Sequence, residues 1–124
     1  MQRATTLLFL LFLLFTLQGC GVSKQANRSP ETDALLQAAR AGNADTVKAL
    51  LTSPNVDVNG VDEYGNTPLI EAARFGHDDV VTALLIARAD VKVKNREGKT
   101  ALMLAAENGH DDTVRVLTQA GAGK

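Results

Sequence analysis

The chain has 124 residues, a formal net charge of −1, and aromatic residues at only 4% of its positions. A nearly neutral chain lacks the strongly basic footprint that nucleic-acid binding usually leaves, so we expect no nucleic-acid partner. Three of the four Phe residues fall within the first 15 positions, so the rest of the chain must build its core from aliphatic side chains. This length allows one small folded domain.

The first segment, residues 1–19, carries a single charge, Arg3. Its uncharged run of Leu, Phe, Thr and Ala extends from Ala4 to Leu17, which is 14 residues. An α-helix needs about 20 apolar residues to cross a membrane. A positive start followed by roughly 7–15 apolar residues is typical of a secretory signal peptide. We therefore predict a signal peptide over residues 1–19.

The end of this segment reads Leu17-Gln18-Gly19-Cys20 and resembles the lipobox of bacterial lipoproteins, although Gln18 stands where a small or apolar residue is commoner. The resemblance implies that Cys20 becomes the N-terminus and carries covalent lipid, which would anchor the chain to a bacterial membrane on the periplasmic side. Gly21 is not the Asp that retains lipoproteins at the inner membrane of enteric bacteria, so the outer membrane is favoured in a Gram-negative organism. The alternatives are an uncleaved membrane anchor and, since Cys20 is the single cysteine, a free thiol or an intermolecular bridge.

The next segment, residues 20–29, is expected to hold the lipidated Cys20 and a flexible tether. Its sequence after the cysteine, GVSKQANRS, is polar and has no hydrophobic period. A flexible chain of this length spans about 15–18 Å, so the folded part would lie close to the membrane. Ser29 suits a helix N-cap and Pro30 suits the first helical position, so we expect the folded domain over residues 30–124.

The rest of the chain repeats itself at a distance of 33 residues. Residues 65–79 read GNTPLIEAARFGHDD and residues 98–112 read GKTALMLAAENGHDD. An earlier unit, with Ala38-Ala39 and Leu50-Leu51 at equivalent places, fits with a shift of 34. A fixed period of about 20–50 residues is typical of a stacked solenoid, in which no unit buries its apolar face alone.

Each unit predicts a turn, two helices and a hairpin. Apolar residues between Leu69 and Ala73 recur at helical spacing, and Gly76 can end that helix in a left-handed cap. An acidic pair at residues 78–79 favours the start of a second helix, because carboxylates are stabilised at the positive end of the helix dipole. Residues 90–96 alternate as a short extended hairpin arm would.

These residues resemble ankyrin repeats, whose pattern is D-x-x-G-x-T-P-L-H-x-A-A-x-x-G-H followed by V-V-x-L-L. Residues 62–85 follow it, and residues 98–117 follow it again. The resemblance implies an all-α ankyrin-repeat solenoid of about three helix-turn-helix repeats with short β-hairpin loops, at about residues 31–60, 61–93 and 94–122. Ile70 and Met103 replace the family's His, which ties neighbouring repeats together, and Ala101 replaces its Pro. We therefore expect a marginally stable stack.

His77 and His110 each precede an acidic pair, which raises the question of a metal site. Equivalent residues of successive repeats lie about 8–10 Å apart, whereas a Zn–N bond measures about 2.0–2.1 Å. We therefore expect both histidines to start helices and to form hydrogen bonds between repeats. The sequence shows no converging acid, base and nucleophile, and a flat stack offers no deep pocket. We expect no enzyme activity, no metal, and no cofactor besides the lipid on Cys20.

The resemblance places partner binding on the concave face, at the hairpin tips and the exposed side of each first helix. The motif carries these positions over to Glu63, Tyr64, Asn66, Arg74, Phe75, Arg96, Glu97, Lys99, Glu107 and Asn108. Tyr and Arg are enriched in binding hot spots, and Phe among interface residues generally. The same residues are also ordinary choices at these family positions. The prediction is a monomer that binds a protein partner here.

A basic stripe on the third hairpin is a second candidate surface. It comprises Lys92, Lys94 and Arg96, with Lys99 nearby, whereas the middle hairpin carries Asp57, Asp62 and Glu63. The stripe is either a solvated hairpin edge or a surface for an acidic partner or anionic lipid headgroups. The function predicted from the sequence is a scaffold or adaptor that holds a partner near the membrane. The alternative is a periplasmic immunity protein or inhibitor of a toxin or hydrolase.

Overall fold

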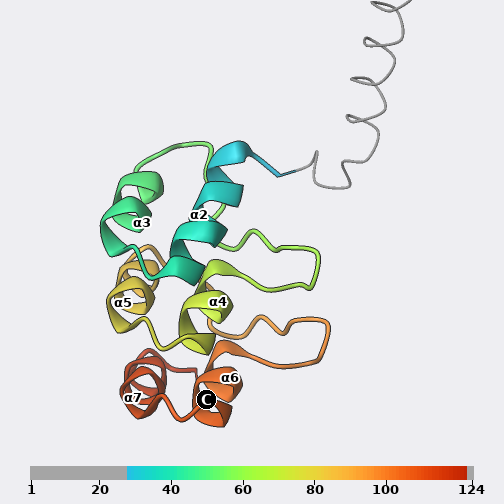
Figure 1. The fold of residues 1–124 in the computed structure, drawn as a ribbon, viewed down its shortest axis with the longest axis vertical. Coiled ribbons are helices and arrows are strands. Elements are labelled where there is room, and N and C mark those ends of the chain that lie inside the picture. Colours follow the sequence, from blue (N-terminus) through green and yellow to red (C-terminus); the bar gives the residue numbers. More distant parts are fainter. Residues whose placement is uncertain (1–27, 123–124) are drawn as a thin grey trace, which may run out of the picture.

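The computed structural model describes residues 28–122, so the predicted signal peptide, Cys20 and most of the tether lie outside the described residues. Within this range the chain forms six helices, which are α2 (Pro30–Ala41), α3 (Ala44–Leu51), α4 (Pro68–Arg74), α5 (Asp78–Ile86), α6 (Ala101–Glu107) and α7 (Asp111–Gln119). Consecutive helices pair as α2–α3, α4–α5 and α6–α7, and the three pairs stack in layers (Figure 1). The predicted all-α repeat solenoid is confirmed. None of the helices in residues 28–122 has the length and apolar character needed to span a bilayer.

The helices form two columns. The inner column contains α2, α4 and α6, and the outer column contains α3, α5 and α7, with each helix packed on the next one in its column. The two long loops, residues 52–67 and 87–100, project from the same edge of the stack, beside the inner column (Figure 1). Loop tips and inner helices therefore form one continuous face.

A hydroxyl side chain starts each helix of the inner column. The Oγ of Ser29 accepts a hydrogen bond from the backbone N of Thr32 at 3.1 Å, with Pro30 at the first helical position, as the sequence predicts. The repeated threonines act in the same way, because Thr67 caps Ile70 N at 3.1 Å and Thr100 caps Met103 N at 3.3 Å. An N-cap of this kind contributes about 1 kcal/mol, so helix α6 keeps its start although Ala101 replaces Pro.

Left-handed glycines end the inner helices. Gly42, Gly76 and Gly109 have φ angles of 77°, 72° and 75°, a region that residues with a Cβ rarely adopt. At Gly76 a second constraint applies, because a Cβ atom there would lie 2.6 Å from Nδ1 of His110. The predicted left-handed cap at Gly76 is confirmed, and the next repeat packs closely against it.

The loops reverse direction as predicted, but residues 28–122 contain no β-strand, so the expected extended hairpin arms are wrong. The carboxylate of Asp62 accepts hydrogen bonds from the backbone N atoms of Tyr64 and Asn66 at 2.8 and 2.9 Å. The amide oxygen of Asn95 takes the equivalent two bonds in the next loop, at 2.9 and 3.1 Å. The side chains thus hold the turn at each loop tip, and one backbone bond closes each turn, from Asp62 N to the Asn66 carbonyl and from Asn95 N to the Lys99 carbonyl, both at 3.0 Å.

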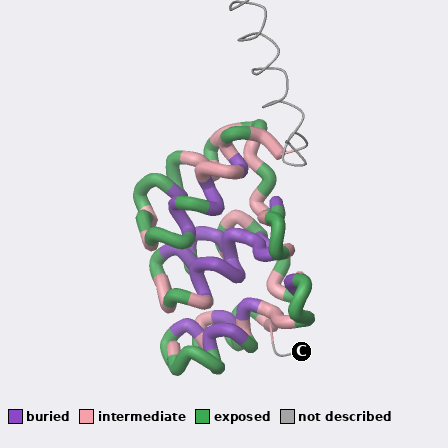
Figure 2. Tube along the Cα trace, turned by 45° about the vertical axis from the view of Figure 1, so that its right-hand side comes forward, coloured by how far each residue is buried: buried purple, intermediate pink, exposed green. Residues whose placement is uncertain are grey.

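The core consists of Leu, Ile, Val and Ala, and it is centred on the middle repeat (Figure 2). Ile70 is 1% exposed and Ala72 and Val80 are fully buried. In the last repeat Met103, the equivalent of Ile70, is 46% exposed. Burial in this fold therefore depends on having a repeat on both sides.

Candidate functional site

The predicted partner-binding residues come from the two long loops and from the C-terminal ends of α4 and α6, and all but Asn66 reach the surface. Seven of them are exposed in the structure, namely Glu63, Tyr64, Phe75, Arg96, Glu97, Glu107 and Asn108. Arg74 and Lys99 are half-buried. The two aromatic side chains, Tyr64 and Phe75, are 62% and 47% exposed. These positions therefore present both aromatic residues of the described chain to solvent.

Tyr64 stands on a fixed backbone. Its N donates to the Asp62 carboxylate at 2.8 Å, and its carbonyl accepts a hydrogen bond from the N of Arg96 in the next loop at 3.0 Å. The following residue, Gly65, has a φ of 78°, and a Cβ there would lie 3.1 Å from the N of Arg96. Neighbouring loops are therefore in close contact, and the backbone that carries the exposed ring is fixed before any partner arrives. Such preorganisation lowers the entropic cost of binding.

Phe75 is anchored through the histidine that follows it. Its ring lies tilted against that of His77, with the centroids 6.2 Å apart. Nε2 of His77 donates to the carbonyl of Arg40 at 3.0 Å, and Nε2 of His110 donates to the carbonyl of Arg74 at 3.0 Å. Both histidines stand immediately before the outer helices α5 and α7. The prediction that they start helices and tie repeats together is confirmed.

Asn66 does not belong to the exposed face. It is 1% exposed, and its Nδ2 donates to Oε1 of Glu71 at 3.1 Å. Its Oδ1 accepts from Nδ2 of Asn95 at 2.9 Å. Because both polar ends of the amide are used inside the protein, the prediction that Asn66 is an exposed contact residue is wrong.

The buried carboxylate of Glu71 is a feature that sequence reasoning missed. It is 1% exposed, and the Arg40 guanidinium approaches it with Nε at 3.3 Å and Nη2 at 3.1 Å. Arg40 Nη2 also reaches Asp62 at 3.4 Å. The hydrogen bond to Glu71 is the main cause that raises the pKa of Arg40, with the charges of Glu71, Asp62 and Glu63 acting in the same direction against the effect of burial. The sequence contains one sign that Glu71 is buried, because the equivalent position of the last repeat holds the apolar residue Leu104.

A groove of about 390 Å³ lies between α2 and the first loop tip. It is lined by Arg28, Asp33, Leu36, Gln37, Arg40, Asp62, Glu63 and Tyr64. Both arginines are already engaged, because Arg28 pairs with Asp33 and donates to the Val61 carbonyl, while Arg40 pairs with Glu71. Glu63 takes part in none of the ion pairs formed within residues 28–122. The groove is thus polar, with Tyr64 and Glu63 at its rim.

The basic stripe behaves differently from its acidic counterpart. Lys92, Lys94 and Arg96 are all exposed, and none is in an ion pair with another residue of the described range. Lys99 instead contacts Glu107 at 2.9 Å, and that hydrogen bond raises the pKa of Lys99. The Asp62 side chain is only 10% exposed. The face is therefore less acidic at the loop of residues 52–67 than the sequence suggests, whereas the loop of residues 87–100 keeps the positive charge of these three side chains.

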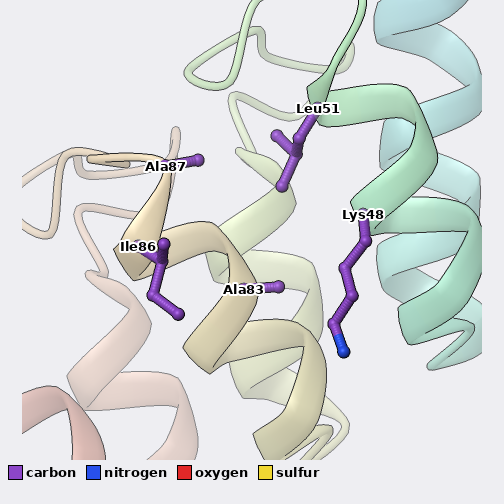
Figure 3. Close-up of a pocket in the computed structure, with 5 residues that line it drawn as sticks. All are labelled: Lys48, Leu51, Ala83, Ile86 and Ala87. Carbon is purple, nitrogen blue, oxygen red and sulfur yellow. The ribbon is translucent and has the colours of Figure 1, made fainter.

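A second groove, of about 310 Å³, lies on the outer column between α3 and α5 (Figure 3). Lys48 and Leu51 of α3 face Ala83, Ile86 and Ala87 across it. Ile86 is 79% exposed. This groove is mostly apolar and is distant from the loop tips, so it provides a comparison surface for experiments on Tyr64. Among residues 28–122 no group of three or more potential metal ligands occurs.

Comparison with known proteins decides the family. A family model described as ankyrin repeats, in three copies, matches residues 4–95 and 35–124. The chain belongs to the ankyrin-repeat family. Its loop-tip face, Thr caps and inter-repeat histidines are therefore parts of an ankyrin stack, and modules of this family act in protein–protein interaction rather than catalysis.

Individual relatives share part of the ankyrin segment. Rat oxysterol-binding protein-related protein 1 is 49% identical over 63 residues, which is 50% of this chain and 7% of that protein. Human ankyrin repeat domain-containing protein 29 is 44% identical over 66 residues, or 53% of this chain and 22% of that protein. BTB/POZ domain-containing protein 3 of Schizosaccharomyces pombe is 37% identical over 59 residues, or 48% and 11%. The matches cover less than a quarter of each relative's length.

Proposed function

We propose that this ankyrin-repeat chain is a membrane-anchored, periplasm-facing module that binds a protein partner as a scaffold or adaptor, without catalysis of its own. The observation that carries partner binding is the exposure of Tyr64, at 62%, on a backbone that two neighbouring loops hold in place. Phe75, which is 47% exposed at the end of α4, is a second exposed aromatic residue. Rigid aromatic side chains of this kind dominate binding energy in many interfaces.

The anchor rests on the sequence that precedes the described domain. Residues 17–20 resemble a lipobox, and Cys20 would carry the covalent lipid. A tether of about eight residues leads from Cys20 to Arg28, and its fully extended length is at most about 28 Å. Arg28 is fixed to Asp33 and to the Val61 carbonyl at one wall of the polar groove. The tether therefore meets the domain beside Tyr64, which would hold a partner bound there close to the membrane surface.

Partner binding is tested by affinity capture with the full-length chain in detergent-solubilised membranes. The Tyr64→Ala/Phe75→Ala double variant should lose the specific partner, because truncating two aromatic anchors at about 2 kcal/mol each lowers affinity by roughly a thousandfold. Ile86→Ala is the matched control, since it removes an exposed apolar side chain on the outer column. Retention of every captured protein by the double variant would rule out this surface.

The alternative function is inhibition of a toxin or hydrolase in the periplasm, as an immunity protein. The observation that favours it is the exposed positive charge of Lys92, Lys94 and Arg96, which suits insertion into an acidic active site. Activity of the captured partner separates the two functions. An adaptor leaves that activity unchanged, whereas an inhibitor abolishes it, and Lys94→Glu with Arg96→Glu should then restore it.

The lipid anchor has its own test. Labelled palmitate should be incorporated into the wild-type chain and not into Cys20→Ala, and the variant should leave the membrane fraction. Label on Cys20→Ala would contradict lipidation at this residue. An unlabelled wild-type chain that stays in the membrane would favour the uncleaved anchor.

A further inference from the structure

The polar groove between α2 and the first loop tip has more acidic than basic side chains. Of the five charged residues that line it, three are acidic and two are basic. Both basic side chains already have a carboxylate partner, because Arg28 pairs with Asp33. Arg40 likewise reaches Asp62 at 3.4 Å. Glu63 is exposed and takes part in none of the ion pairs within residues 28–122, so one carboxylate of the groove is left without a cation.

Charges just outside the lining do not remove this excess. The carboxylate of Glu71 contacts Arg40 at 3.1 Å from inside the protein, so that guanidinium is shared between two carboxylates. The hydrogen bond to Glu71 is the main cause that raises the pKa of Arg40, and the charge of Glu63 acts in the same direction. Arg96 lies in the following loop, whose backbone bonds to Tyr64, but its side chain forms no ion pair with Glu63. The groove therefore favours an incoming cation over an anion.

The rim of the groove combines this carboxylate with an aromatic ring. Glu63 and Tyr64 are consecutive residues that both line the groove, and Tyr64 is 62% exposed. A carboxylate can accept two parallel hydrogen bonds from one guanidinium, and the face of an aromatic ring attracts the same cation. An ammonium group lacks the planar fork, so arginine matches this pair of groups better than lysine does.

We propose that the polar groove recognises an arginine side chain of the protein partner, with Glu63 as the carboxylate acceptor and Tyr64 as the ring against which the guanidinium stacks. This inference rests on the proposed function and deepens it, because it gives the chemistry of the partner, which is a segment with an exposed arginine. The groove volume of about 390 Å³ is near the lower end of the roughly 300–1,000 Å³ of ligand pockets, which suits a single extended side chain.

A nuclear magnetic resonance titration of the full-length chain in detergent micelles tests the site without any partner. The probes are three blocked tripeptides, each with a central arginine, glutamine or glutamate between two glycines. The arginine peptide should shift the backbone amide signals of Glu63 and Tyr64 in a saturable way, and the other two peptides should not. Equal shifts with the glutamine peptide, or shifts with the glutamate peptide, would overturn the proposal.

Charge-neutral variants test which carboxylate binds the peptide. Glu63→Gln should weaken binding of the arginine peptide about tenfold, because a charge-assisted hydrogen bond is replaced by a neutral one. Asp45→Asn is the matched control, since it removes the same charge from an exposed residue of α3 on the outer column and should leave binding unchanged. Wild-type affinity in folded Glu63→Gln would contradict the proposal. Binding that appears only in Lys24→Gln would show that the tether of the chain itself, and not a partner, fills the groove.

Affinity capture separates this inference from the proposed function. Glu63→Arg should release a partner that is captured through Tyr64, because it places a second guanidinium against the partner's arginine. Asp45→Arg makes the same charge change on the outer column and should retain the partner. If Tyr64→Ala/Phe75→Ala loses the partner and Glu63→Arg keeps it, partner binding stands and the arginine site is wrong.

Discussion

The middle and last repeats share one sequence pattern and one local geometry, but they differ in their neighbours. Thr67 and Thr100 cap their helices in the same way, and Gly76 and Gly109 have φ angles of 72° and 75°. Packing nevertheless separates them, because the middle repeat is covered on both sides and the last on one. In a repeat stack the energetic value of a residue is therefore set by the adjacent repeats as much as by its own repeat.

The middle and last repeats also differ in their buried polar groups. The middle repeat holds the Glu71 carboxylate at 1% exposure because Arg40 reaches it from the first repeat and Asn66 joins it to Asn95 of the following loop. The last repeat has Leu104 at the equivalent position. A buried charge is tolerated only where hydrogen-bond partners surround it, and the middle layer alone has partners on both sides.

The two repeats should differ most in stability when equivalent apolar side chains are truncated. Ile70→Ala should lower the free energy of unfolding by about 3 kcal/mol, because it leaves a cavity between two layers. Met103→Ala should lower it by less than about 1 kcal/mol, since that side chain is 46% exposed and leaves no enclosed cavity. Urea unfolding followed by circular dichroism measures both. Equal losses would show that the last layer is as tightly packed as the middle one.

The next largest loss of stability is expected when the buried carboxylate of Glu71 is removed. Glu71→Ala should destabilise by about 2 kcal/mol, because it leaves the Asn66 amide and the Arg40 guanidinium without their partner. The cost stays at this level because the Arg40 side chain is 50% exposed and water can solvate it. Glu71→Leu copies the last repeat and refills the volume, so it should cost less than Glu71→Ala. A stability change under about 0.5 kcal/mol for Glu71→Ala would contradict a structural role for the network.

Substitution of the capping glycines should also affect the two repeats differently. Gly76→Ala and Gly109→Ala both force a left-handed residue with a Cβ, at about 1 kcal/mol each. At Gly76 the new Cβ would also lie 2.6 Å from His110 Nδ1, whereas at Gly109 nothing lies within 4 Å. Gly76→Ala should therefore lower the free energy of unfolding by about 1 kcal/mol more than Gly109→Ala does. This difference corresponds to a further decrease in melting temperature of about 4–8 °C. Identical melting temperatures would mean that the His110 ring yields freely.

The smallest effects on stability are expected on the loop-tip face. Tyr64→Ala and Phe75→Ala should each change the free energy of unfolding by less than about 0.5 kcal/mol, as exposed substitutions usually do. A larger loss at Tyr64 would show that its ring supports the loop rather than serving a partner. The same thermal and urea measurements decide this point.

The sequence predicted the features that depend on local chemistry repeated along the chain. The Ser29 cap follows from the Ser29-Pro30 pair, and the left-handed Gly76 and the inter-repeat roles of His77 and His110 follow from one repeat and its copy. The missed features depend on residues far away in sequence. Glu71 meets Arg40 across 31 positions, and Asn95 meets Asn66 across 29. No single repeat pattern reveals such partners.

The loop of residues 87–100 shows why an alternating pattern does not by itself predict a strand. Alternation in residues 90–96 indicates an extended arm, and Lys92, Lys94 and Arg96 are indeed exposed together. Whether an extended arm becomes a strand depends on which groups take its backbone donors. In residues 90–96 the N of Asp90 donates to Oδ1 of Asn59 at 2.8 Å and the N of Lys92 donates to Oδ1 of Asp90 at 2.9 Å. Side chains therefore take donors that a partner strand would use.

Photo-cross-linking in living cells tests most directly whether the loop-tip face holds a protein. A photoreactive aromatic residue replaces Tyr64 in the full-length chain, and a matched variant carries it at Ile86 on the outer column. We expect one discrete adduct from position 64 that is absent at position 86. No adduct at position 64, or the same adducts at both positions, would contradict partner binding at this face.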